Sequence, residues 1–370
     1  MTPNVPMQSL LDAEGAIDPA KDPHIDPAVL LKVYEHMLLL RALDGRMMNL
    51  QRQGRIGFYG TALGEEASTL GSAAAVRDTD WVFPALRQGG VLLYRGFPLE
   101  AFIAQLIGNS GDVLNGHQMP CHYADRGVNV VAWSSCIATQ LPHAVGMAWA
   151  ARFKGKDDIA VAYLGDGATS SPDFHAAMNF AGVWKAPVVF VCQNNHWAIS
   201  VPVEAQTAVK ELVRKADGYG IPGVRVDGND VLAVHAAVSE AAARARRGEG
   251  PTFIECVTFR IGGHSSSDDP TRYRENATVE AWKAKDPVVR FRRYLEGRGL
   301  WDEAKETAAN ERWNTRIGET IKVAEAQPAP AVESVFESVY ASPPWNLREQ
   351  RDWLVAEGGG HAKDEGRFPL

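Results

Sequence analysis

The stretch IAVAYLGDGATS at residues 159–170 decides the predicted fold. It opens with an apolar run, Ile159–Leu164, which is typical of a strand buried on both faces of a parallel sheet. The run ends in the triplet GDG at 165–167, and a helical pattern over residues 173–184 follows. Ligands of open parallel sheets bind beyond the carboxyl ends of the strands, where helix N-termini favour phosphate. The stretch therefore predicts a strand, a ligand-binding turn and a helix.

The alternation of apolar runs and helical segments continues on both sides of this stretch. Further strands are predicted at residues 187–192, 224–226 and 252–259, and further helices at 27–53, 231–247 and within 278–325. Short apolar runs that alternate with helical segments indicate consecutive βαβ units, whose crossovers are right-handed. We therefore expect an α/β fold, a mostly parallel sheet with helices on both faces.

The expected organisation has three parts. Residues 1–26 form an irregular arm, 27–275 the α/β domain, and 276–370 a helical region packed on the same domain. The polar run that begins at Ser265 is expected to be an exposed, mobile loop. Gly146 and Ala150 lie on one face of a predicted helix, which suits either close packing inside the chain or a contact with another subunit.

Composition excludes several classes of protein. The 370 residues carry 38 Lys and Arg against 45 Asp and Glu, a net charge of −7, so nucleic acid is not expected as the main partner. A hydrophobic content of 45% excludes a disordered chain. The four cysteines form no Cys-x-x-Cys pair, which suits a reducing compartment. No secretory signal and no membrane-spanning run of roughly 20 apolar residues is visible, so a cytoplasmic protein is expected.

Two strand ends together predict a metal site. Asp166 stands between two glycines, where a carboxylate would repel a bare pyrophosphate unless a cation lay between them. The next strand is followed by Asn195, whose amide oxygen could share that cation. Mg²⁺ prefers oxygen ligands of this kind, together with phosphate and water. In the alternative interpretation Asp166 caps the helix and Asn195 makes a turn.

This pattern resembles the thiamine diphosphate motif, and the chain from about Leu31 to Leu300 resembles the alpha subunits of 2-oxo acid dehydrogenases, above all the branched-chain group. The resemblance rests on ordered blocks: QRQGRI at 51–56, FY at 58–59, GEEA at 64–67, QMP at 118–120, HY at 122–123, SS at 134–135, ATQ at 138–140, RIG at 260–262, HS at 264–265 and DD at 268–269. It implies a thiamine diphosphate-binding fold.

The resemblance also implies roles for individual residues. Mg²⁺ would be held by the side chains of Asp166 and Asn195 and the carbonyl of Trp197. The cofactor would be bound by Arg87, Ser135, Ile137, Gly165, Asp166, Gly167, Ala168, Asn195 and His264. The 2-oxo acid would lie near Phe58, Leu86, His122 and Ser135, and His264 and His122 would be the catalytic residues. Ser134, Thr139 and Gln140 resemble a potassium site, and Ser265 stands where animal relatives are phosphorylated.

Several of these residues have ordinary structural alternatives. Arg87 could form a surface salt bridge, Phe58 and Ile137 could be core residues, and His122 could be a hydrogen-bonded turn histidine. Three positions also depart from the family: Leu86 replaces a Tyr, and His117 and Gln193 replace Arg. These departures affect the pocket wall and the neutralisation of the diphosphate.

The implied activity is oxidative decarboxylation of branched-chain 2-oxo acids, such as 3-methyl-2-oxobutanoate, with transfer of the acyl group to a lipoyl-lysine on a transacylase core. In this family, the carboxylate that activates the cofactor belongs to a glutamate of a separate beta subunit. No residue of this sequence can be assigned to that task, and Glu65 and Glu66 are candidates only by residue type. The resemblance therefore implies half of an active site, in an assembly of two alpha and two beta chains.

Three other functions stay open at this point. A pyruvate or acetoin dehydrogenase would differ by little in the substrate pocket, since one methylene changes discrimination by only about 1–3 kcal/mol. A nicotinamide-dependent oxidoreductase would need a third glycine where Ser170 stands. A non-catalytic interaction subunit would need neither the metal pair nor His264.

Overall fold

A computed structural model describes residues 4–337 and 339–357. Its main sheet has five parallel strands in the order β1-β2-β3-β7-β6. The strands are β1 (Trp81–Phe83), β2 (Ala160–Gly165), β3 (Val188–Asn194), β6 (Gly223–Asp227) and β7 (Thr252–Val257). A short antiparallel pair, β4 (Trp197–Ala198) and β5 (Val201–Pro202), lies outside this sheet. The predicted parallel α/β fold is confirmed.

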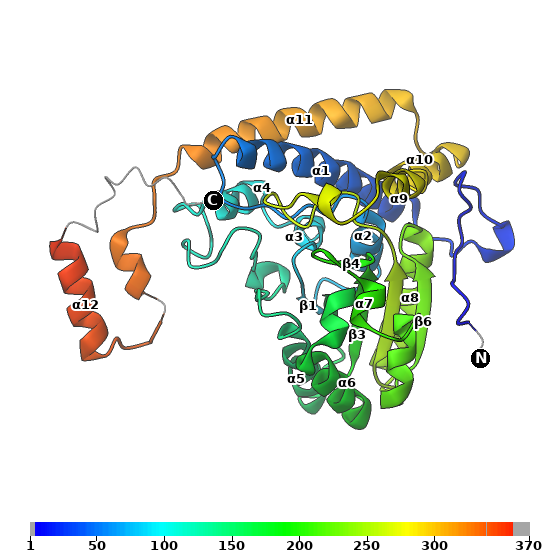
Figure 1. Cartoon of the computed structure of the whole chain (residues 1–370), viewed down its shortest axis with the longest axis horizontal. Coiled ribbons are helices and arrows are strands. Elements are labelled where there is room, and N and C mark those ends of the chain that lie inside the picture. Colours follow the sequence, from blue (N-terminus) through cyan, green and yellow to red (C-terminus); the bar gives the residue numbers. More distant parts are fainter. Residues whose placement is uncertain (1–3, 338, 358–370) are drawn as a thin grey trace.

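Helices cover both faces of the sheet, because side chains alternate across each strand. In β2, Val161 and Tyr163 pack with one core cluster, whereas Ala162 and Leu164 pack with the other. The first cluster includes α1 (Pro27–Arg52), α2 (Glu66–Ala74), α3 (Gly89–Tyr94), α4 (Leu99–Ile107) and α8 (Val231–Arg246). The second includes α5 (Gln140–Phe153) and α6 (Pro172–Trp184), which lie together below the sheet in Figure 1.

The strands predicted from apolar runs all form, with small shifts at their ends. The predicted strand 252–259 ends at Val257, and 224–226 extends to Gly223–Asp227. Strand β1 was not predicted, because three residues are too short for a periodic pattern to show.

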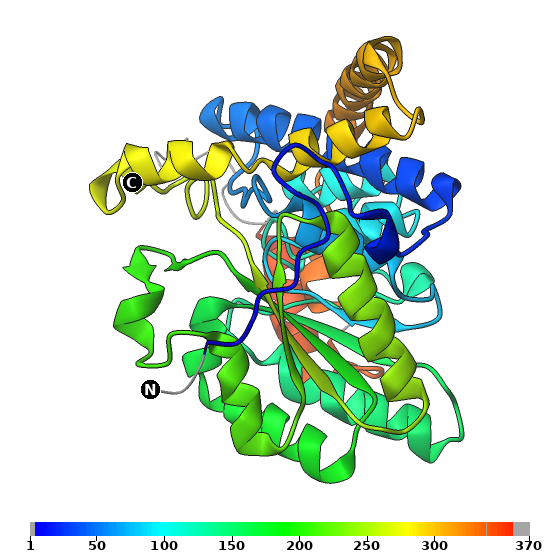
Figure 2. The ribbon, with the colours of Figure 1, turned by 90° about the vertical axis from the view of Figure 1, so that its right-hand side faces the viewer.

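The N-terminal arm follows the open edge of the sheet (Figure 2). Gln8 forms a parallel bridge with Val226 of the edge strand β6, and its backbone exchanges hydrogen bonds with Arg225 and Asp227. The arm is thus largely irregular in shape, apart from the short helix η1 (Pro19–Lys21), but it is paired to the domain.

The C-terminal helices differ in how they pack. After α9 (Asn276–Lys283), helices α10 (Pro287–Gly297) and α11 (Glu303–Glu325) contribute residues to the first core cluster, and α11 lies beside α1. Helix α12 (Trp345–Ala356) buries no residue and extends from the body with η6 (Val332–Phe336) (Figure 1). The expectation that all of 276–370 packs on the domain is therefore wrong for α12, and residues 338 and 358–370 lie outside the described part of the chain.

The expectation of an exposed loop after Ser265 is only partly met. Ser267, Asp269, Thr271 and Arg272 are exposed, whereas Ser265 is buried. Ser266 exchanges two hydrogen bonds with Tyr59, and Asp268 accepts hydrogen bonds from the His264 N–H and the Tyr273 hydroxyl. Gly146 is exposed, and no atom lies within 4 Å of a Cβ built there, which disagrees with close packing inside the chain, one of its two alternatives. Within the described residues, no helix is long and apolar enough to cross a bilayer.

Five further helical segments are short. They are η2 (Arg126–Val128), η3 (Asp166–Ser170), α7 (Val203–Gln206), η4 (Leu212–Tyr219) and η5 (Pro270–Arg272). Of these, η3 and α7 border the site described next.

Candidate active site

A cavity of about 690 Å³ lies at the carboxyl ends of β2 and β3. Every residue predicted from the sequence to bind Mg²⁺, the cofactor or the substrate lines it: Phe58, Leu86, Arg87, His122, Ser135, Ile137, Gly165, Asp166, Gly167, Ala168, Asn195, Trp197 and His264. The parallel strands explain this convergence, because their carboxyl ends meet at one edge of the sheet. Their assigned roles remain predictions.

Asp166 directly follows β2 and is almost completely buried. Its Oδ2 accepts a hydrogen bond of 3.0 Å from the Gln206 amide. Burial raises the pKa of Asp166, and the Gln206 hydrogen bond opposes this rise. A buried carboxylate of this kind is expected to bind a cation, since the positive charge removes the cost of its burial.

Asn195 follows β3 and is held from two sides. Its amide nitrogen donates to Glu65 Oε1 at 2.9 Å, and its Oδ1 accepts from the Trp197 backbone N–H at 3.2 Å. The amide oxygen is thereby turned away from Glu65. The Trp197 carbonyl, the third predicted metal ligand, accepts a hydrogen bond from Arg260 at 3.1 Å.

Gly167 is required by a close approach of two segments. A Cβ built there would lie 2.6 Å from the Cβ of Ala198 in β4, a distance that real Cβ atoms do not adopt. No atom lies within 4 Å of a Cβ built at Gly165. The second glycine of the motif thus lets η3 approach the β4–β5 hairpin, while the first leaves open space.

Arg87 is a buried ion-pair residue, so the surface salt-bridge alternative is wrong. Its Nε lies 3.4 Å from Glu65 Oε1, and its terminal nitrogens donate to the carbonyls of Thr61 and His264. Burial lowers the pKa of Arg87 while Glu65 opposes the change, and burial raises the pKa of Glu65. The pair is nonetheless expected to be ionised, because guanidinium groups keep their proton in proteins.

His264 is neutral in this structure. Its Nδ1 lies 3.3 Å from the Arg87 guanidinium, which can only donate, so the ring proton belongs on Nε2. Burial, and then the charges of Arg87 and Arg260, lower the pKa of His264 to about 4. A negatively charged ligand in the cavity would raise this pKa.

His122 is hydrogen-bonded at both nitrogens, as its turn-histidine alternative required, and it also lines the cavity. Its Nδ1 lies 3.1 Å from the Pro120 carbonyl and therefore carries the proton, which leaves Nε2 to accept from the Ser135 hydroxyl at 2.8 Å. The ring stacks on Trp133 with centroids 4.0 Å apart. The hydrogen bonds and the stacking hold its orientation.

Ile137 stands at the cavity mouth with 59% of its surface exposed, so it is not a core residue. Phe58 fits both of its interpretations, because it packs against the core and also lines the cavity. An exposed isoleucine beside a cavity large enough for an organic ligand is expected to be covered when such a ligand binds.

The family departures fall in different places. Leu86 lines the cavity and packs against Gly60, and Gln193 belongs to a buried network with Gln88, Ser68 and Thr69. His117 is exposed and does not line the cavity. Among the predicted potassium residues, Ser134 and Gln140 line the cavity, whereas the Thr139 hydroxyl donates to the Cys136 carbonyl.

Arg260 was not assigned a role from the sequence, yet it lines the cavity and is fully buried. Arg260 comes shortly after β7, which ends at Val257. Its position at the same edge of the sheet could therefore have been predicted from the sequence. It donates to the carbonyls of Trp197 and Ile199 and to the Tyr273 hydroxyl, but its Nε has no partner in the described part of the chain. An unpartnered buried guanidinium nitrogen suits an anionic ligand.

Glu65 and Glu66 differ in their position relative to the cavity. Glu66 does not line the cavity, because it binds Arg41 at 2.7 Å and the Gly64 N–H at 2.9 Å. Glu65 does line it but is committed to Arg87 and Asn195. The cavity therefore combines two buried arginines, the two histidines His122 and His264, and the carboxylate of Asp166 beside a glycine turn, a set that fits a diphosphate bound through a cation.

These features define a polar cavity at one edge of a parallel sheet, and the chain belongs to the dehydrogenase E1 component family, which matches residues 34–333. Three relatives are similar over nearly the whole chain. The mitochondrial 2-oxoisovalerate dehydrogenase subunit alpha 2 of Arabidopsis thaliana is 45% identical over 97% of this chain and 77% of its own length. The mitochondrial alpha subunits of the same enzyme from Homo sapiens and Dictyostelium discoideum are 43% and 41% identical, each over 95% of this chain and 79% and 80% of their own lengths.

The comparison corrects the expected location. The relatives are mitochondrial subunits, and this finding contradicts the expectation of a cytoplasmic protein. Family membership also disagrees with a nicotinamide-dependent oxidoreductase.

Proposed function

We propose that this chain is the alpha subunit of a branched-chain 2-oxo acid dehydrogenase, and that it decarboxylates substrates such as 3-methyl-2-oxobutanoate with thiamine diphosphate and Mg²⁺. The observation that carries the proposal is the convergence of Asp166 and Asn195 with Arg87, Arg260 and His264 in one cavity. The names of the similar relatives support the branched-chain substrate over pyruvate or acetoin.

The residues of the cavity would have separate roles in binding the metal, the cofactor and the substrate. Asp166, Asn195 and the Trp197 carbonyl would hold Mg²⁺, and Arg87 and His264 would bind the diphosphate beside Gly165, Gly167 and Ala168. Ile137 and Ser135 would contact the middle of the cofactor. Phe58 and Leu86 would provide an apolar wall for the branched side chain, and His122, with its protonated Nδ1, would place Nε2 and Ser135 beside the 2-oxo acid.

Thiamine diphosphate supplies an electron sink for the carbanion left when CO₂ departs. Among the described residues, Glu65 is the one glutamate that lines the cavity, and its pairing with Arg87 leaves it unsuited to activate the cofactor. We therefore propose that a beta subunit completes the site, that two alpha and two beta chains assemble, and that the acyl group passes to a lipoyl-lysine of a transacylase core.

Asp166→Asn tests the metal assignment. The loss of one negative charge should weaken Mg²⁺-dependent binding of thiamine diphosphate at least about tenfold, since charge-assisted contacts contribute roughly 1.5–3 kcal/mol. Calorimetric titration of the cofactor, with and without Mg²⁺, measures this. Asp173→Asn, on α6 and outside the cavity lining, is the matched control and should bind normally. Equal binding by both variants would refute the assignment.

Activity tests the proposed substrate and the proposed half-site. The chain alone should release almost no CO₂, whereas the chain with a beta subunit should decarboxylate 3-methyl-2-oxobutanoate faster than pyruvate. A preference for pyruvate would reassign the substrate. Full activity without a beta subunit would contradict the half-site, and no activity with a competent beta subunit would favour a non-catalytic interaction subunit.

A further inference from the structure

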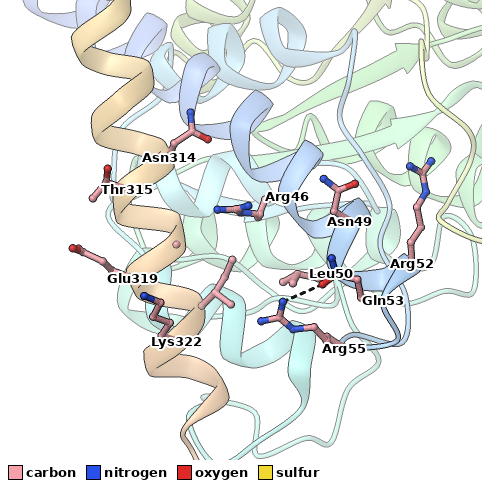
Figure 3. A pocket seen from close by; sticks show the side chains of 12 residues that line it. Arg46, Asn49, Leu50, Arg52, Gln53, Arg55, Asn314, Thr315, Glu319 and Lys322 are labelled. Atoms are coloured by element: carbon pink, nitrogen blue, oxygen red, sulfur yellow. Dashed lines mark hydrogen bonds between the residues drawn. The ribbon is translucent and has the colours of Figure 1, made fainter.

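A second cavity, of about 710 Å³, lies in the cleft between the C-terminal half of α1 and helix α11 (Figure 3). It shares no lining residue with the candidate active site. Its volume is in the range of small-molecule sites, and is larger than a single inorganic ion needs. Nothing in the proposed function uses this cleft.

Positive charge collects around the cleft. Four cationic side chains line it, namely Arg46, Arg52, Arg55 and Lys322, against one acidic side chain, Glu319. Glu325, which pairs with Arg55, reduces the local excess further but leaves it positive. The whole chain carries −7, so this excess opposes the average charge of the protein. A local concentration of one sign of charge in a cleft attracts ligands of the opposite sign.

Arg46 is the side chain that most suggests a ligand. Its guanidinium points from α1 toward α11 (Figure 3), and it makes no hydrogen bond or ion pair within the described part of the chain. It faces Gly318, where a Cβ would lie 3.6 Å from Arg46 Nη2. Glycine inside a helix costs roughly 0.5–1 kcal/mol relative to alanine, and here it leaves the cleft open beside the guanidinium.

The other cationic side chains differ in whether neighbouring residues bind them. Arg55 is oriented by two 2.6 Å contacts with Glu325 and a 3.1 Å hydrogen bond to Gln53, which is drawn in Figure 3. The side chains of Lys322 and Arg52 have no partner among the described residues, but Arg52 points away from α11 (Figure 3). Arg46 and Lys322 therefore hold most of the charge that faces the cleft.

Stabilisation of the α1 terminus does not account for Arg46. Cations favour the C-terminal end of a helix, but that effect falls off within the last turn. Arg52 lies in the last turn of α1, whereas Arg46 lies six residues before it, more than one turn away. Helix stabilisation thus explains Arg52 and leaves Arg46 unexplained.

We propose that this cleft binds an organic polyanion, a small molecule with two or more phosphate or carboxylate charges on an organic body. Arg46 and Lys322 would bind the anionic groups, since guanidinium matches both phosphate and carboxylate in a bidentate geometry. The amides of Asn49 and Asn314 offer hydrogen bonds, and Leu50 and Ile321 provide apolar contact for the body.

The test is a calorimetric titration of the full chain, assembled with a beta subunit and saturated with thiamine diphosphate and Mg²⁺, so that the diphosphate locus of the active site is filled. The probes are ADP, which represents an organic phosphate, and citrate, which represents a polycarboxylate. We expect at least one of them to bind at one site per alpha chain. The probe with the higher affinity shows whether the cleft prefers phosphate or carboxylate groups. Failure of both probes overturns the proposal.

Two variants locate the binding. Arg46→Ala with Lys322→Ala should weaken it by roughly tenfold or more, whereas the control pair Arg126→Ala with Lys156→Ala, exposed cations outside the cleft, should not. Gly318→Leu keeps every charge but fills the cleft, and it should also abolish binding while the melting temperature is maintained. Unchanged affinity in either variant contradicts the proposal. Because the readout needs no catalysis, a failure here is distinct from a failure of the proposed function.

Discussion

At the residue scale, Arg87 connects the segments that surround the cofactor cavity. Its guanidinium reaches Glu65, the Thr61 carbonyl and the His264 carbonyl, so residues from three separate stretches of the chain meet at one side chain. Asp44 supports the same segment from α1, because its carboxylate accepts hydrogen bonds from the Tyr59 hydroxyl and the Ala62 N–H at 2.7 and 2.8 Å. Burial raises the pKa of Asp44 to about 7. The order of this loop thus depends on buried polar contacts.

Titration of His264 should show the influence of Arg87. In the cofactor-free chain, NMR should find that His264 titrates near pH 4, well below its ordinary value of 6.5. The folded state then holds fewer protons than the unfolded state, so the free energy of unfolding falls as the pH drops from 6.5 toward 4. Arg87→Ala removes one cause and should raise the pKa. A titration near 6.5 in the unmodified chain would contradict this account.

Gly167→Ala tests the close approach at the glycine turn. The added methyl group would lie 2.6 Å from Ala198 Cβ, so η3 or the β4–β5 hairpin must shift. Overpacking of this kind costs roughly 1–3 kcal/mol, which thermal or urea unfolding of the cofactor-free chain would measure. Gly165→Ala meets no neighbour within 4 Å and is the matched control for stability. Equal stability of the two variants would show that the contact is relieved without cost.

At the scale of elements, Asp230 joins the N-terminal arm to helix α8. One carboxylate oxygen caps α8 through the N–H groups of Leu232 and Ala233, and the other accepts hydrogen bonds from Leu10 and Leu11 of the arm. The arm is thereby fixed to the sheet edge without forming a regular strand of its own. Its irregular sequence gave no periodic pattern from which this pairing could be predicted.

Asp230→Ala should therefore cost more than the loss of a helix cap alone. A cap contributes about 1 kcal/mol, and the buried Leu11 N–H and the partly buried Leu10 N–H would also lose their acceptor, so we expect a loss of at least about 2 kcal/mol in the free energy of unfolding. Asp302→Ala is the control, because it removes an exposed cap from α11 and nothing else. Denaturant unfolding compares the two, and similar losses would mean that the arm contacts contribute nothing.

At the scale of the whole molecule, α5 and α6 present an apolar outer face. Phe153 and Val183 are 78% and 70% exposed, Trp149 stacks on Phe153, and the ring centroids of Trp149 and Trp184 lie 5.7 Å apart. Gly146 lies open on the same helix, α5. Exposed apolar patches of this kind mark contacts with other proteins, which favours the subunit-contact interpretation of Gly146 and Ala150.

We expect this face to contact another subunit of the proposed assembly. Phe153→Glu with Val183→Glu should prevent association with a beta subunit, because two charges would be buried without partners. The melting temperature of the isolated chain should not fall, since both side chains are exposed. Size-exclusion chromatography with light scattering measures the assembly. Val289→Glu, an exposed position on α10, is the control, and normal assembly of the double variant would contradict the expectation.

Local patterns in the sequence determined the parallel α/β fold and the positions of Asp166 and Asn195, because apolar runs define strands and the residues after parallel strands must meet at one sheet edge. The family motifs added Arg87, His122 and Ile137 to the same cavity. Tertiary structure alone decided which of these residues touch, since each contact joins stretches far apart in the chain. It also placed Arg260 in the cavity, buried Ser265, left α12 unpacked and opened the cleft at Arg46. Burial and pairing at these sites depend on neighbours from other elements, and no local pattern encodes those neighbours.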